Sequence, residues 1–155
     1  MREIREKLCE LAAAYDEQLQ LYNKIEEVGS GEQKLIHDGH LDRLLEILKE
    51  KEGLLKQAGE YEQRIRSLQD QLADHFALSH FSLPQLRLAA PPYYQEEIAA
   101  LESAVSNLLP VLEALEEQER RNEASLSRYL EAKQRVRTKK AQIRLAERAY
   151  GKKEP

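Results

Sequence analysis

The sequence is poor in the residues that stabilise small disulfide-bonded or aromatic-rich domains. It has no tryptophan, two phenylalanines and one cysteine among 155 residues. Because Cys9 has no second cysteine in the chain, an intrachain disulfide is excluded, which fits a reducing compartment. The segment MREIREKLCE has no apolar signal core, and no window approaches the roughly 18 apolar residues of a membrane span. We therefore expect a soluble, cytoplasmic protein without membrane insertion.

Sequence motifs of catalysis and cofactor binding are also missing. The chain has no P-loop, no dinucleotide fingerprint, no GxSxG and no HExxH spacing. Metal-ligand residue types cluster once, at His37, Asp38, His40 and Asp42, but this is an Asp-Gly turn, where such residues collect for local hydrogen bonding. We predict that the protein is not an enzyme and has no catalytic residue, no cofactor and no metal site.

The sequence is rich in charged and helix-forming residues. Charged residues make up 34% of it, a composition typical of long helices and coiled coils. The clearest pattern lies between Leu41 and Leu72, where apolar residues recur at steps of three and four with one gap at Lys51. These residues predict a helical rod of about 48 Å, at roughly 1.5 Å per residue. One amphipathic rod cannot bury its own apolar stripe, so the rest of the chain must supply partner surfaces.

The same spacing predicts two further helices. The glycines of GSG at 29–31 weaken the first helix, and HDGH at 37–40 is the expected turn. The proline-containing segment 78–92 is also apolar, and we expect it to fold back over the end of a bundle; a partner-binding loop is the alternative. The expected helices cover residues 2–28 (or 2–37), 40–77 and 93–118. We predict an all-α fold, an elongated antiparallel helical hairpin or coiled-coil bundle of about three long helices, with residues 1–118 as its core.

The apolar stripe of the last helix changes character after Leu115. Pro110 is expected to kink or restart this helix. The stripe then continues through Glu119, Asn122, Leu126, Tyr129, Lys133, Val136, Lys140 and Ile143. Such a stripe cannot enter the core without burying unpaired ions, which is costly. We therefore predict that residues 119–155 project as a partner-binding helix and basic tail.

The projecting segment is strongly basic. Residues 133–153 contain nine Lys or Arg and one Glu, a local charge of +8, although the net charge of the whole chain is −4. A solvated helix end and contact with an acidic protein partner are both consistent with this charge. Nucleic-acid binding is disfavoured, because Tyr150 alone could stack on a base.

Three stretches resemble the FlgN family, the flagellar export chaperones for hook–filament junction proteins. The segment LIHDGHLDRLLEILKEKEGLLKQAGEYEQ resembles the first helical hairpin of that family. ERRNEASLSRYL and AYG at 149–151 resemble the family's Asn-to-Leu segment and its terminal Tyr-Gly. The matching positions are Gly39, Leu44, Leu45, Leu48, Lys51, Leu54, Leu55, Asn122, Leu126 and Tyr129. The chain departs from the family in its KKEP ending and in its unusually basic last helix.

The resemblance implies an all-helical cytoplasmic chaperone. Such proteins bind the C-terminal helices of hook-associated proteins, hold them unpolymerised and present them to the flagellar export apparatus. In the family the binding portion is the C-terminal helix and tail, which implies a partner-binding set of Asn122, Leu126, Tyr129, Val136, Ile143 and Tyr150. Of these, Asn122 would set the register of the partner helix and Tyr150 would contact the export machinery.

Three alternatives remain open from the sequence. A FliJ-like stalk coiled coil would have two long uninterrupted helices, and the glycines at 29–31 and the prolines at 84–92 argue against it. A structural or tethering coiled coil would need a second copy to complete its seam, as a homodimer. A nucleic-acid-associated helical protein would lose affinity steeply with salt.

Overall fold

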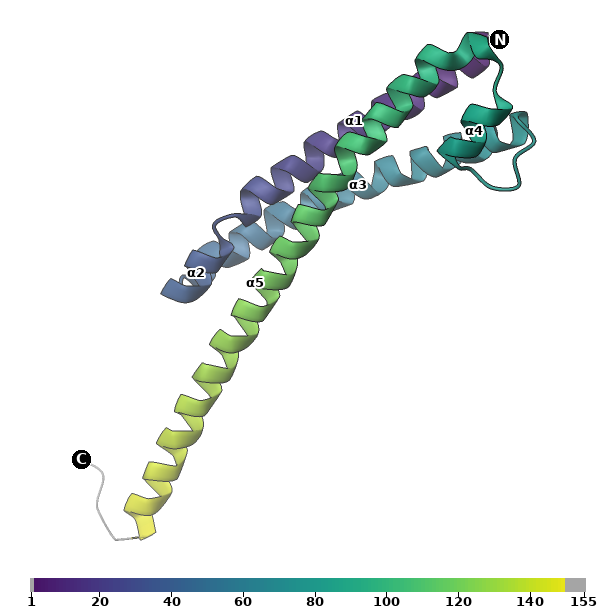
Figure 1. Ribbon diagram of the computed structural model, residues 1–155. Coiled ribbons are helices and arrows are strands. Elements are labelled where there is room, and N and C mark those ends of the chain that lie inside the picture. The colour runs from purple at the N-terminus through teal and green to yellow at the C-terminus, as the bar shows by residue number, and fades with distance from the viewer. Residues whose placement is uncertain (1, 150–155) are drawn as a thin grey trace.

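The computed structural model describes residues 2–149, and every regular element in that range is helical (Figure 1). The three long helices are α1 (Arg2–Gly29), α3 (Leu41–His75) and α5 (Gln95–Ala149). The short ones are α2 (Glu32–Asp38), α4 (Leu83–Ala89) and a 3-10 turn, η1 (Pro92–Tyr94). The prediction of an all-α fold with three long helices is confirmed.

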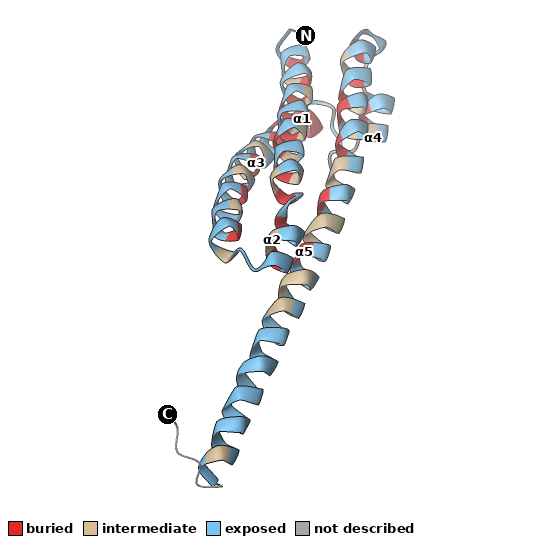
Figure 2. Cartoon of the chain, turned by 90° about the vertical axis from the view of Figure 1, so that its left-hand side faces the viewer, coloured by how far each residue is buried: buried red, intermediate tan, exposed pale blue. Residues whose placement is uncertain are grey.

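Helix α1 lies in the middle of the assembly. It packs against both α3 and α5, whereas α3 and α5 share few direct contacts with each other. Figure 2 shows the three helices in this order, with α3 and α5 on opposite sides of α1. The chain direction makes α3 antiparallel to the other two, and α5 extends well beyond the end of α1 (Figure 1).

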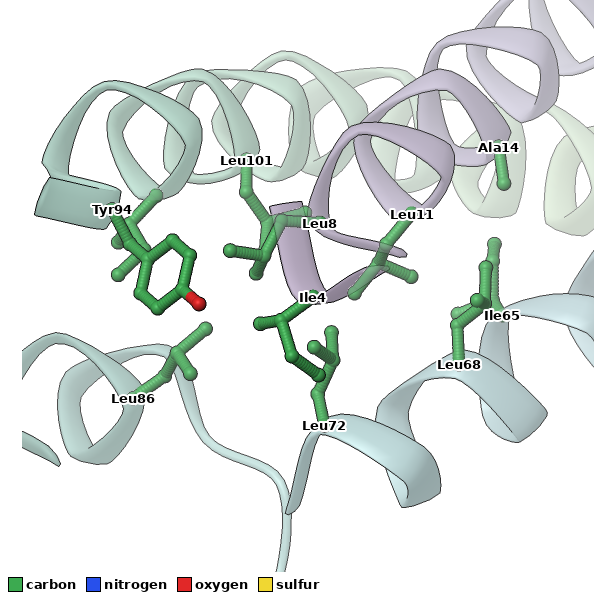
Figure 3. Packing of buried hydrophobic residues seen from close by; sticks show 11 residues of the cluster. Ile4, Leu8, Leu11, Ala14, Ile65, Leu68, Leu72, Leu86, Tyr94 and Leu101 are labelled. Carbon is green, nitrogen blue, oxygen red and sulfur yellow. The ribbon is translucent and has the colours of Figure 1, made fainter. Parts of the chain in front are cut away.

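The hydrophobic core is concentrated at the end of the bundle where α1 begins. Leu8, Leu11, Leu72, Leu86 and Leu101 are each 0% exposed. In Figure 3 their side chains come from four different helices and converge with Tyr94. Fully burying one leucine stabilises a fold by about 1.5–3 kcal/mol relative to leaving it exposed, so this cluster anchors α1, α3, α4 and α5 together.

The segment between α3 and α5 closes this end of the core. Ser82 caps α4 by accepting a hydrogen bond from the backbone N–H of Gln85, and Pro84 lies in the first turn, where a missing N–H is tolerated. Leu86 of α4 is fully buried, and Phe81 and Leu83 pack around the cluster. The expectation that this apolar segment folds back over the bundle is confirmed.

Helix α5 is continuous for 55 residues, a length of about 80 Å. The expected restart at Pro110 is wrong, because the helix passes through this residue without ending. Pro110 lies on the exposed side of the helix, and because it has no backbone N–H it removes one hydrogen bond there. The division that we placed at residue 119 is therefore not a break in the helix.

One described stretch, within Pro92–Ala149, is apolar enough by length and composition to cross a membrane. This corrects our expectation that no window comes near such a span, since residues 98–115 contain two charged residues only, both glutamates. Leu101 and Leu108 in this stretch are buried against the other helices. Core helices of soluble proteins show the same pattern, so the stretch is weak evidence for a membrane span.

Candidate interaction surface on the last helix

One face of α5 carries a residue of the predicted stripe at every seventh position. We call this set the heptad line; it consists of Leu101, Leu108, Leu115, Asn122, Tyr129, Val136 and Ile143. A seven-residue repeat keeps the same face of a helix turned toward a neighbouring helix. Leu101 is fully buried and Leu115 is 8% exposed, but Val136 and Ile143 are 53% and 56% exposed. The line therefore begins in the core and ends in solvent.

Two amides on α5 cap the C-terminal end of α1. The last carbonyls of a helix have no partner within it and need one from elsewhere. Gln118 Nε2 donates to the carbonyl of Glu26 over 2.9 Å, and Asn122 Nδ2 donates to the carbonyl of Gly29 over 3.4 Å. Gly29 permits this close approach, because a Cβ at that position would lie 2.5 Å from Gln118 Oε1.

Asn122 consequently lies inside the molecule. It is 5% exposed, so its amide fixes α5 against the end of α1 and does not face an open surface. The resemblance to the FlgN family implied that Asn122 sets the register of a partner helix. The carbonyls at the end of α1 account for its polarity, and we leave Asn122 out of the proposed docking surface.

A buried ionic cluster joins α2, α3 and α5 at Glu119, three residues before Asn122. Lys51 of α3 is 4% exposed, and its ammonium donates to Glu32 Oε1 of α2 over 2.5 Å and also to Glu119 of α5. Glu32 is 3% exposed and stands in the first turn of α2, where the helix dipole favours a negative charge. The cluster therefore fixes the positions of three helices relative to one another.

The environment of Lys51 favours its charged form. Burial alone lowers the pKa of this ammonium and is the largest single influence on it, whereas its hydrogen bonds to Glu119 and Glu32 act in the opposite direction. Together with the attraction of the two carboxylates, they raise the pKa of Lys51 above its ordinary value of 10.5. Lys51 is thus a cation at every physiological pH, and its buried charge is compensated within the chain.

Helix α2 covers the next part of the stripe. Leu126 and Tyr129 are half-buried, and Tyr129 shares a shallow hollow with Ile36 of α2. The chain turns away from α5 at Gly39, which has a φ of 72°, a left-handed conformation that favours glycine. A Cβ at Gly39 would lie 3.4 Å from Tyr129 Oη, so the turn approaches the ring closely. Beyond Tyr129 no other described element covers α5.

Residues 130–146 of α5, which we call the distal segment, are all exposed (Figure 2). Leu130, Val136, Ile143 and Leu145 are each more than half exposed. The one ion pair in the described part of this segment is a long one, Arg135 to Glu131 at 4.0 Å. The segment is therefore an apolar and basic surface without a partner in the described chain.

The predicted partner-binding residues thus fall into three groups. Val136 and Ile143 lie on the open distal segment, Leu126 and Tyr129 lie at its border, and Asn122 is buried. Tyr150 lies outside the described residues. Because intrachain contacts continue to Tyr129, the free arm begins at residue 130, about two helical turns beyond the buried Asn122, and not at residue 119.

The comparison with protein families decides the identity of the chain. A family model described as FlgN protein matches residues 1–153. The chain belongs to the FlgN family. The resemblance found in the sequence is confirmed, and the protein is a flagellar export chaperone of this family, which is not known as enzymatic. No curated protein and no solved structure matches the chain.

Sequence reasoning on this FlgN-family chain missed the cluster around Lys51. The signal was present, since Lys51 interrupts the apolar stripe of α3 and Glu119 is the first charge on the stripe of α5. Opposite charges that interrupt two apolar stripes are candidates for one buried pair. No group of three His, Cys, Asp or Glu residues within residues 2–149 is placed to hold a metal ion.

Proposed function

We propose that this FlgN-family chaperone binds the C-terminal helical segments of hook-associated proteins in the cytoplasm, and keeps them unpolymerised until they reach the flagellar export apparatus. The observation that carries the proposal is the distal segment of α5. It continues the heptad line beyond the last intrachain contact and is exposed on all sides.

The heptad line indicates how a partner helix would bind. Along α5, the line is covered first by α1 and then by α2, which end one after the other. A partner helix that packs on Tyr129, Val136 and Ile143 would continue the same path and extend the bundle by one more helix. Burial of Val136 and Ile143, which are 53% and 56% exposed, favours the complex; a side chain that goes from fully exposed to fully buried gains about 1.5–3 kcal/mol, which is an upper limit for each of them.

Release of the client follows from the same geometry. Part of the free energy gained by burying apolar side chains is offset by the ordering of a partner segment that has no fixed structure alone. Few apolar residues take part, because the distal segment offers Val136 and Ile143 on the line and charged residues between them. We therefore expect a complex that protects the client and still dissociates at the export apparatus.

The test uses the C-terminal segment of a hook-associated protein as the ligand, with affinity measured by titration calorimetry. The double variant Val136→Asp/Ile143→Asp should lose at least about tenfold in affinity, because carboxylates replace the apolar side chains of the docking face. Gln134→Asp/Gln142→Asp is the matched control, with the same charge change on the opposite side of the same helix. Equal affinities for the two variants would contradict the proposal.

A second copy of the chain is the alternative occupant of the exposed apolar surfaces. Leu45 and Leu55 of α3 are 58% and 49% exposed, so α3 also offers a face on which another helix could pack. Light scattering of the purified chain distinguishes the two cases. A stable homodimer that dissociates in Val136→Asp/Ile143→Asp would assign the distal segment to self-association.

A further inference from the structure

We propose that the helix docking on the distal segment is acidic, with Asp or Glu side chains facing Lys133 and Lys140. This inference rests on the proposed function and adds the chemistry of the client. It follows from the positions of the cations on α5 and from their lack of carboxylate partners. It also follows from the ion pair that the chain forms at the equivalent position two heptads earlier.

The distal cations are in excess over nearby carboxylates. Residues 133–149 contain seven Lys or Arg and one Glu. Arg135 is the one among those described that pairs with a carboxylate, Glu131. Lys133 lies 5.3 Å from the centroid of the Tyr129 ring, a contact that leaves its positive charge uncompensated. The segment therefore presents a positive surface that attracts an anionic partner.

Two of these cations lie on the docking face itself. A second row of α5 residues precedes the heptad line by three positions: Ile98, Val105, Leu112, Glu119, Leu126, Lys133 and Lys140. In a coiled coil these two rows together face the neighbouring helix. A helix that covers Val136 and Ile143 must also remove water from Lys133 and Lys140. Covering an ammonium is costly unless the partner supplies an opposite charge.

The chain already shows this solution two heptads earlier. Glu119 occupies the same row as Lys133, at the point where α2 packs on α5, and its side chain is 42% exposed. Lys51 of α3 meets it there with an ion pair. At Lys133 and Lys140 the signs are reversed and no described helix is present, so carboxylates on the partner would complete the seam in the same way.

A protein helix fits this surface better than a nucleic acid does. Phosphates would pair with the cations, but they offer no apolar groups to cover Val136 and Ile143. An acidic amphipathic helix satisfies both kinds of residue, because its apolar stripe covers the heptad line while its carboxylates meet the lysines.

The experiment uses three synthetic 21-residue amphipathic peptides as probes. They share the same leucine stripe and differ at the positions facing Lys133 and Lys140, which carry Glu, Gln or Lys. The full chain should bind the Glu peptide at least about tenfold more tightly than the Gln peptide, with the Lys peptide weakest. The variant Lys133→Glu/Lys140→Glu should reverse this order.

The matched control is Arg120→Glu/Arg135→Glu, which changes the net charge equally but away from the docking face. This control should keep the preference for the Glu peptide. Equal binding of the Glu and Gln peptides, the same order in both charge variants, or tighter binding of a short DNA duplex than of any peptide would overturn the inference.

The result separates this inference from the proposed function. If a hook-associated segment depends on Val136 and Ile143 but the peptides show no charge preference, the acidic partner is wrong and the docking surface stands. If the charge preference is found but the hook-associated segment binds equally well to Val136→Asp/Ile143→Asp, the client assignment is wrong.

Discussion

Replacing Lys51 by methionine tests how α2, α3 and α5 are held together. The substitution keeps the length of the side chain but removes the ammonium that donates to Glu32 and Glu119. The Glu32 side chain is 4% exposed, so its carboxylate would stay buried without a counter-ion, whereas the Glu119 side chain is 42% exposed and can be solvated. Removing one partner of a buried pair costs about 3–5 kcal/mol, and the solvated Glu119 favours the lower end, about 3 kcal/mol.

The assay is urea unfolding followed by circular dichroism at 222 nm. Lys51→Met should lower the free energy of unfolding by about 3 kcal/mol, whereas the control Lys49→Met, on the exposed face of α3, should change it by less than about 0.5 kcal/mol. The combined variant Glu32→Met/Lys51→Met/Glu119→Gln should recover most of the loss, because no charge is then buried. Equal stability of Lys51→Met and Lys49→Met would refute the structural role of the cluster.

The same cluster predicts a dependence of stability on alkaline pH. The pKa of Lys51 is higher in the folded chain than its ordinary value of 10.5. Its contribution to stability is therefore complete below about pH 10.5 and is lost as the pH rises through the folded-state pKa. The difference in unfolding free energy between the unsubstituted chain and Lys51→Met should shrink above that pH. A difference that stays constant up to pH 12 would contradict this linkage.

Two further pairs of substitutions test the turn and the core by the same unfolding assay. Gly39→Ala should destabilise the chain by about 1–2 kcal/mol, because alanine disfavours a φ of 72°, whereas Gly53→Ala, within α3 and with nothing within 4 Å of the added Cβ, should stabilise it by about 0.5–1 kcal/mol. Leu101→Ala should lower the free energy of unfolding by about 2–5 kcal/mol, because Leu101 is fully buried. Leu109 is 54% exposed, so Leu109→Ala should lower it by less than about 0.5 kcal/mol. A change of the unfolding free energy in the same direction for both glycine variants, or an equal decrease of it for both leucine variants, would contradict the packing described.

The fold was predictable because its helices follow simple periodic patterns. The three-four spacing of α3 and the Asp-Gly turn before it located this helix to within two residues at each end. The sequence could not predict that α5 passes through Pro110. A proline on the exposed side of a continuous helix has the same local sequence pattern as a proline that kinks or ends a helix. It also could not show that α1 occupies the middle of the bundle, which depends on the relative packing of all three stripes.

The candidate site was only partly predictable for a related reason. The change from apolar to charged residues after Leu115 indicated that α5 leaves the core, and residues 130–146 are exposed. The position of the change was less clear, because Glu119 and Asn122 are polar residues with intrachain partners, Lys51 and the carbonyl of Gly29. A polar residue on a stripe is ambiguous until the group opposite it is known.

The most direct test of the docking surface is hydrogen–deuterium exchange of the free chain and of its complex with a hook-associated C-terminal segment, followed by mass spectrometry. Amides of residues 130–146 should exchange rapidly in the free chain, because no tertiary contact covers them. On binding they should become protected, while those of α1 and α3 stay unchanged. Protection confined to the exposed leucine face of α3, with residues 130–146 still exchanging rapidly, would contradict the account.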